Sequence, residues 1–257
     1  MILFLIKKTF FDVWDNLLSI FLINIGAVLL LGGCLSVLQH FEGRPSLFIA
    51  GIILTLVVLM LYIGTASQLT KEMADFKSPD FKHIFATINK DGLASLVFGV
   101  MLVLQVFVVG FAIPWYFARG NLLGIALAGL LFWGNLLWML ASQYYFPVRN
   151  RLDTKIRQIP KRCLMLLFDN TGFTIALGLG TLVLVILSFF TAFLFPGIGV
   201  ILLWHQVAVR LRVYKYDYFE EYPDGARKRI PWERLLAEDK DRVGTRTLRG
   251  MIFPWKG

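Results

Sequence analysis

The feature that most constrains this chain is a series of long intervals without a charged side chain. Asp, Glu, Lys and Arg are absent from residues 16–41, 45–70, 92–118, 120–148 and 170–209. An α-helix needs about 20 apolar residues to cross roughly 30 Å of hydrocarbon, so each interval can hold a span. The composition agrees, because 57% of the residues are hydrophobic and 17% charged, whereas a soluble domain has roughly 45–50% and about 25%. The sequence therefore predicts an all-α, polytopic integral membrane protein.

The last interval decides the number of spans. It is too long for one helix, and Pro196-Gly197 interrupts it, because proline lacks an amide donor and glycine permits a tight turn. We predict two spans there and six transmembrane helices in all, at residues 17–38, 46–67, 93–116, 122–146, 171–191 and 194–212. The alternative is one kinked, tilted helix over this interval, which gives five spans and termini on opposite sides.

The distribution of basic residues favours six spans. With six, Arg44 and Arg119 are alone on one side, and every other Lys and Arg lies on the opposite side. By the positive-inside rule, both termini are then cytoplasmic. The net charge of +9 follows from this topology and from attraction to anionic lipids, so we predict no nucleic-acid partner.

Three segments share one plan, in which an amphipathic stretch and a short Asp/Asn junction precede an apolar span. They are residues 10–16, 81–92 and 161–172. Asn, Asp and Gly favour a sharp turn at the junction, and the Asp or Asn oxygen can accept a hydrogen bond from the first amides of the next helix. The predicted unit is an interfacial helix followed by a transmembrane hairpin, occurring three times; alternatively, any transition from interface to membrane favours such caps. The resulting divisions are an interfacial helix (1–16), a transmembrane domain (17–212) and a cytoplasmic tail (213–257).

The layout also resembles a known family. The resemblance covers roughly residues 1–220 and rests on the amphipathic beginning, the aromatic and basic loop 76–92, Tyr145 to Asp153 at the end of the fourth span, and Phe195-Pro196-Gly197. On these features the chain resembles the YesL-like family of bacterial six-span membrane proteins, which are commonly encoded with carbohydrate ABC transporters. This resemblance implies a place in the bacterial cytoplasmic (inner) membrane and ABC transporter subunits as partners.

Strongly polar side chains at membrane depth are the candidates for an intramembrane pocket. They are Asn24, Gln105, Asn135, Gln143, His205 and Gln206. Hydrogen bonds between helices are the alternative role, because they stabilise packing by roughly 0.6–2 kcal/mol.

Two further regions are candidates for contacts with lipids or a partner. The first is a basic loop, which can bind anionic lipid, a phosphate-bearing ligand or an acidic protein surface; it contains Arg149, Arg151, Lys155, Arg157, Lys161 and Arg162. The second is the apolar end of the chain, Phe253, Pro254 and Trp255. These residues can dock on the protein's own cytoplasmic face or in a partner's groove.

No catalytic, metal-binding or phosphate-binding motif is apparent in the sequence, since the three histidines lie on different segments and no glycine loop suited to phosphate occurs. We therefore predict a non-enzymatic protein without cofactor or metal. The favoured function is that of an accessory or assembly partner of a membrane complex such as a carbohydrate ABC transporter. The alternative is a small-solute transporter or channel lined by the polar pocket.

Overall fold

The described part of the chain is helical throughout its regular secondary structure. The computed structural model describes residues 1–41, 43–152, 155–222, 230–244 and 246. The elements are α1 (Ile2–Asp15), α2 (Leu17–Gln39), α3 (Pro45–Ala74), η1 (Phe81–His83), α4 (Ile84–Phe107), η2 (Val108–Ala112), α5 (Ile113–Ala118), α6 (Leu122–Ser142), α7 (Tyr145–Leu152), η3 (Ile156–Gln158), α8 (Ile159–Asp169), α9 (Thr171–Phe190), α10 (Gly197–Glu221), α11 (Trp232–Leu235) and α12 (Ala237–Val243).

Five helical segments of the described chain are long and apolar enough to cross a membrane. They are Leu17–Gln39, Pro45–Ala74, Ala86–Ala118, Leu122–Ser142 and Thr171–Phe190, and they coincide with the first five predicted spans. The third is continuous through α4, η2 and α5, where η2 is a π-helical stretch just before Pro114. A π-turn widens the helix, which accommodates a residue without an amide donor. The prediction of an apolar, helical membrane protein is confirmed at this level.

The interval 170–209 contains two helices instead of one kinked helix. α9 ends at Phe190, and α10 begins at Gly197 after a turn that includes the cis peptide bond Phe195–Pro196. Gly197 has φ +65°, and a Cβ there would collide with the Asn24 side chain, so glycine is required at this position. α10 continues to Glu221, past the predicted domain boundary at residue 212. α10 is not among the five candidate spans, because polar and charged side chains in its middle and second half lower its hydropathy. The sixth span stays a prediction.

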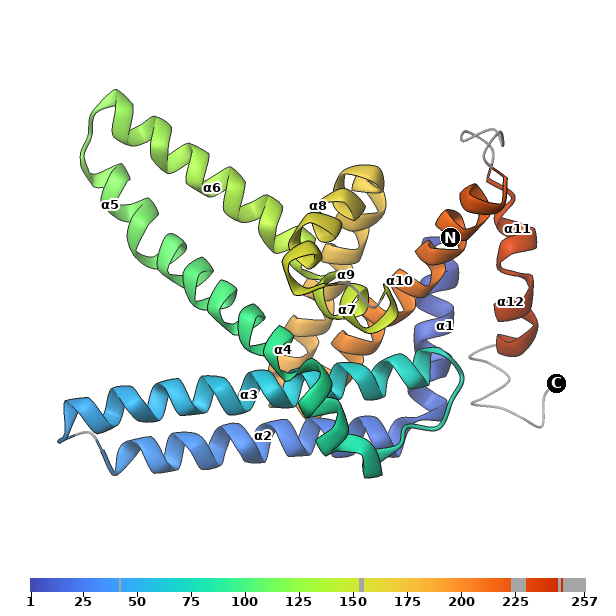
Figure 1. Ribbon diagram of the computed structural model, residues 1–257, viewed down its shortest axis with the longest axis horizontal. Helices are drawn as coiled ribbons and strands as arrows, with labels where there is room; N and C mark the ends of the chain where they lie inside the picture. Colours follow the sequence, from blue (N-terminus) through green and yellow to red (C-terminus); the bar gives the residue numbers. More distant parts are fainter. Residues whose placement is uncertain (42, 153–154, 223–229, 245, 247–257) are drawn as a thin grey trace.

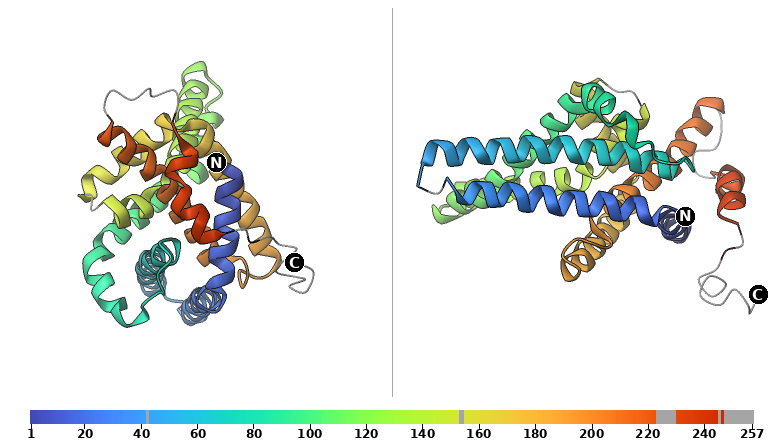
Figure 2. Two further views of the ribbon diagram at one scale, coloured as in Figure 1. Left: turned by 90° about the vertical axis from the view of Figure 1, so that its right-hand side faces the viewer. Right: turned by 90° about the horizontal axis from the view of Figure 1, so that it is seen from below.

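The long helices form three hairpins that leave a common base in different directions. The hairpins are α2 with α3, the α4–α5 helix with α6, and α9 with the first half of α10 (Figures 1 and 2). We call the end where they join the base; it comprises α1, α7, α8, α12 and residues 206–221 of α10. α10 packs against α1, α2, α3, α7 and α9. The core of the protein therefore surrounds α10.

Tyrosines at the start of α7 fix two hairpins to this core. Tyr144 and Tyr145 are buried. The Tyr144 hydroxyl lies 2.7 Å from Thr174 Oγ1 on α9, and the Tyr145 hydroxyl donates to the carbonyl of Ala94 on α4, at 2.8 Å. A buried phenol needs such a partner. These bonds join the second and third hairpins at the base.

The Asp/Asn junctions behave differently from the prediction. Helices do end at Asn16 and Asn170, but neither side chain caps the following helix; instead each amide donates back, to the carbonyls of Asp12 and Leu166. At the second junction the predicted turn is wrong, because α4 runs through it without a break. The Asp91 carboxylate accepts from Arg149, which satisfies its charge within a continuous helix. The threefold repeat stays a prediction.

Candidate functional site

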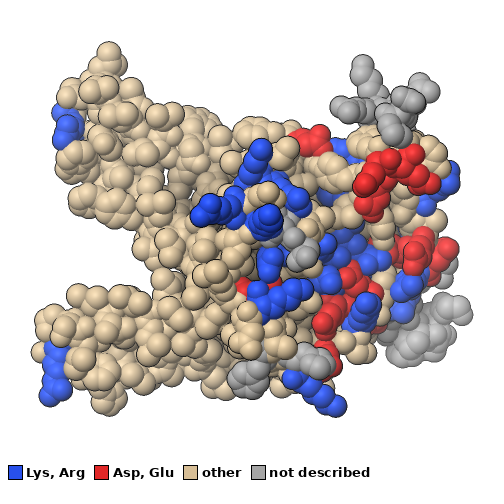
Figure 3. Space-filling model, in the orientation of Figure 1, with Lys and Arg blue, Asp and Glu red and all other residues tan. Residues whose placement is uncertain are grey.

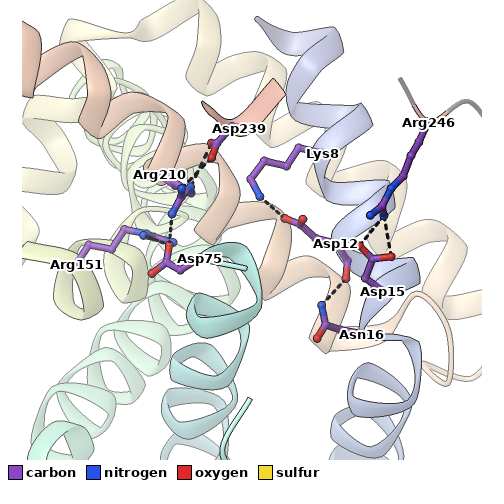
Figure 4. Close-up of polar contacts among 9 residues, drawn as sticks. All are labelled: Lys8, Asp12, Asp15, Asn16, Asp75, Arg151, Arg210, Asp239 and Arg246. Carbon is purple, nitrogen blue, oxygen red and sulfur yellow. Dashed lines mark hydrogen bonds and ion pairs between the residues drawn. The ribbon is translucent and has the colours of Figure 1, made fainter. Parts of the chain in front are cut away.

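Charged side chains from separate helices meet at the base and form one network (Figure 4). Asp75, at the end of α3, accepts hydrogen bonds from Arg151 of α7 and Arg210 of α10, both at 2.7 Å. The same Arg210 holds both oxygens of Asp239 on α12, at 2.8 and 3.2 Å. Bidentate pairs of this kind are strong and fix orientation. The network therefore joins four helices that are distant in sequence.

The protonation states in this network follow from its geometry. Burial alone would raise the pKa of Asp75, but the two guanidinium groups outweigh burial and lower it below the usual value. Burial also opposes the charge of Arg210, yet the carboxylates of Asp239 and Asp75 raise its pKa. Opposite charges at hydrogen-bond distance favour the ionised forms. Asp75 and Arg210 are therefore ionised at neutral pH.

A second ion pair lies beside the network and is more deeply buried. Lys8 and Asp12 on α1 are 0% and 3% exposed, and their charged atoms are 2.8 Å apart. The Lys8 ammonium also lies 3.5 Å from the ring centroid of Phe76, a cation–π contact. Burial raises the pKa of Asp12 to about 7, although Lys8 acts to lower it. This pair holds α1 against the end of α3.

The segment after α10 docks on the same base. Leu236 and Val243 are each 2% exposed, and the Lys7 ammonium donates to the carbonyl of Gly244 at 3.1 Å. Arg246 pairs with Asp15 at 2.8 Å. This part of the predicted tail thus packs on the protein's own surface. The predicted contact residues Phe253, Pro254 and Trp255 lie outside the described residues.

The residues of the predicted basic loop have different environments. Arg149 and Arg151 form ion pairs within the fold, with Asp91 and Asp75, and their predicted contacts with lipids or a partner stay a prediction. Lys155, Arg157 and Lys161 are exposed, and Arg162 is half-buried. Beside them on α8, Met165 and Phe168 are exposed. This combination of cations and apolar side chains suits the surface of an anionic membrane.

Apolar cavities open along the hairpins of the described chain. The central cavity has the most polar side chains in its lining. It has a volume of about 520 Å³ and lies between the second hairpin and helices α9 and α10. Gln143 and His205 both line it. Thr181 of α9 lies between them, 3.0 Å from Gln143 Oε1 and 2.9 Å from His205 Nε2. The structure thus brings two of the six predicted pocket residues into one cluster.

The other predicted pocket residues lie in three further places. Gln105 and Asn135 line a second cavity of about 430 Å³ between α4 and α6. Asn24 donates to the carbonyls of Leu194 and Pro196 and accepts from the Gly199 amide, and so fixes the turn before α10. Gln206 is buried and bonds to Ser67. The six side chains therefore do not share one cavity.

Several residues of these clusters were missed by sequence analysis. Thr181 was not considered, because a threonine within an apolar span bonds a carbonyl of its own helix, as Thr181 does with Leu177. Asp75 and Asp239 belong to no motif that distinguishes them from other charged residues of the sequence. The Lys8–Asp12 pair had a usable signal in its i, i+4 spacing. The partners of the other charges come from distant helices and leave no such signal.

Comparison with known proteins gives no match to a family model, a curated protein or a solved structure. The chemistry of the two sites is therefore read from their geometry. Among the described residues no group of three or more His, Cys, Asp or Glu side chains could hold a metal ion. The base can hold helices in fixed directions, and the central cavity can hold an apolar molecule.

Proposed function

We propose that this protein is a non-enzymatic accessory or assembly subunit of a membrane complex, and that it binds apolar transmembrane helices of a partner between its hairpins. The observation that carries this proposal is that only a small share of the residues in each candidate span is buried within the protein. In the most apolar window of each, between 6% and 22% of the residues are buried within the chain. A bundle that served only itself would pack its helices closely.

The surfaces between hairpins support a protein partner. A cavity of about 430 Å³ lies between α4 and α6 within the second hairpin, and one of about 520 Å³ lies where this hairpin faces α9 and α10. Figure 3 shows two apolar arms separated by a hollow. Small residues line these places, among them Gly134 and Gly178. Such residues allow another helix to approach closely in a membrane.

The base supports the same proposal, because it would keep the hairpins apart. Arg210 and Asp75 connect α3, α7, α10 and α12 through ion pairs. Buried pairs are good at specifying one arrangement even where they add little net stability. A scaffold with fixed hairpin directions presents its apolar faces to a partner in one relative orientation.

The charge distribution supports the proposed orientation. In Figure 3 most charged side chains gather over the base, and basic side chains also mark the ends of the two arms. Arg44 and Arg119 lie at the turns of the first and second hairpins. By the positive-inside rule we propose that the base and both termini lie in the cytoplasm, with the spans in a bacterial inner membrane. Lys155, Arg157 and Lys161 would then meet anionic headgroups.

The solute-channel alternative has less support. In the described chain, none of the four cavities has a Lys, Arg, Asp or Glu in its lining, and the polar side chains are dispersed. A hydrated solute would lose hydrogen bonds to water in such a place. The resemblance to the YesL-like family leads us to propose a carbohydrate ABC transporter as the partner.

The test is site-specific photo-crosslinking in native membranes. A benzoylphenylalanine replaces Leu130, which lines the α4–α6 cavity, or Leu122 at the hairpin tip as the control; both side chains are exposed, 69% and 86%. We expect one protein of defined mass to be crosslinked at residue 130 only. Co-purification of that protein should then be lost with Leu130→Trp and kept with Leu122→Trp. Lipid adducts alone, or equal crosslinks at both positions, would refute the proposal.

A further inference from the structure

The central cavity combines an apolar wall with one cluster of hydrogen-bonding groups. Its lining comes from α3, α4, α6, α7, α9 and α10, and its volume of about 520 Å³ lies within the range of ligand pockets, roughly 300–1,000 Å³. The polar members of its lining are Ser142, Gln143, Thr181 and His205. The Ser142 hydroxyl already donates to the Met139 carbonyl. The other three side chains form the cluster described above.

The hydrogen bonds of Gln143 and Thr181 determine where the protons lie. Gln143 Nε2 donates to the carbonyl of Leu140 at 3.0 Å, so its Oε1 is the atom that faces Thr181. Thr181 Oγ1 then donates to this oxygen at 3.0 Å, and the carbonyl of Leu177 is a further acceptor at 2.9 Å. A hydroxyl has a single proton to donate. The Thr181 hydroxyl therefore has no proton left to donate to His205.

The state of His205 follows. Its Nε2 lies 2.9 Å from Thr181 Oγ1, and because the hydroxyl proton is directed elsewhere, the ring must donate from Nε2. No acidic side chain is among the described residues of the cavity, so a charged imidazolium would be buried without a counterion. A neutral ring protonated on Nε2 has an acceptor lone pair on Nδ1. Among the described residues no donor to Nδ1 is found.

We infer that the central cavity binds a neutral lipid alcohol, whose hydroxyl donates to His205 Nδ1 and whose hydrocarbon chain lies against the apolar wall. A fatty acid or a phosphate would bring a negative charge without a cation in the cavity lining. An ester or ketone would bring only acceptors and leave Nδ1 unpaired, which costs free energy in an apolar place. Diacylglycerol and isoprenoid alcohols share the required chemistry. The same cavity supports the proposed partner helix, but the lipid alcohol is tested on the purified protein without a partner, so either proposal can fail without the other.

The experiment measures displacement of a diazirine-bearing hexadecanol from the purified full-length protein in nanodiscs, with the labelled peptides identified by mass spectrometry. The competitors are two matched pairs, dioleoylglycerol with its acetate and farnesol with its acetate. In each pair the acetate lacks the hydroxyl donor and carries an acetyl group in its place. We expect labelling on α9 and α10, and at least one alcohol should compete about fivefold better than its acetate, the effect of one hydrogen bond. Which alcohol does so identifies the source of the ligand.

Variants test the role of the histidine. His205→Phe should remove the preference for the alcohol, whereas Asn135→Leu in the α4–α6 cavity should keep it. Equal competition by alcohol and acetate on the wild-type protein, a preference that survives His205→Phe, or labels confined to other helices would each overturn the inference. The wild-type competition needs no variant, so it decides even if His205→Phe fails to fold.

Discussion

Removal of the Asp75 charge is the most direct test of how the hairpins are held. Asp75→Asn preserves shape but leaves the guanidinium groups of Arg151 and Arg210 without their shared carboxylate. The side chains of the three residues are 15%, 10% and 16% exposed, and Arg151 already has two buried nitrogens without a partner. Breaking a fully buried pair costs about 3–5 kcal/mol. Allowing for the remaining exposure, we expect the free energy of unfolding to fall by about 2–4 kcal/mol.

The assay is reversible unfolding in mixed detergent micelles, followed by circular dichroism. The matched control is Glu238→Gln, because Glu238 forms an i, i+4 pair with Arg242 in which the two side chains are 67% and 51% exposed; such a pair contributes about 0–1 kcal/mol. If Asp75→Asn costs no more than this control, the ion pairs do not hold the hairpins. Spin labels at residues 44 and 119, at the turns of the first and second hairpins, add a second readout. The distribution of distances between the two labels should broaden in Asp75→Asn.

Three further predictions concern other parts of the base and the turn. Burial raises the pKa of Asp12 to about 7 from its ordinary value of 3.8, so between these two pH values the folded protein holds a proton that the unfolded chain has released, and this residue lowers stability as pH rises through that range. The unfolding free energy of Asp12→Asn relative to wild type should therefore increase over the same range when unfolding is measured as a function of pH. A difference that does not change with pH would contradict the raised pKa. Gly197→Ala introduces a side chain at φ +65° and should lower the free energy of unfolding by about 1–2 kcal/mol or more. Gly32→Ala is the control, because Gly32 has open space around it, and it should not lower this free energy. Equal folded yields of the two variants would show that the turn tolerates a side chain. Cys163 is fully buried, and burial raises the pKa of its thiol to about 12, so maleimide should label it only after denaturation, and rapid labelling of the native protein would contradict this burial.

The local sequence determined the helices and most of their limits. The charge-free intervals predicted six spans, of which the first five coincide with the candidate spans of the described chain. The break at Pro196-Gly197 predicted two helices in the last interval. Both are local signals, since hydropathy and backbone preference depend on neighbours in the chain. The same local reasoning failed at residues 89–92, where the polar residues predicted a turn. There a distant partner, Arg149, satisfies Asp91 and lets the helix continue.

Tertiary structure alone decided which polar groups meet. The sequence shows Gln143, Thr181 and His205 on three separate spans, and Asp75, Arg151, Arg210 and Asp239 on four separate segments. Only the packing of helices that are distant in the chain brings each set within hydrogen-bond distance. Hydropathy decides that a segment enters the membrane, because transfer from water depends on its own side chains. It does not decide which face meets which neighbour, because that depends on fit between helices distant in the chain.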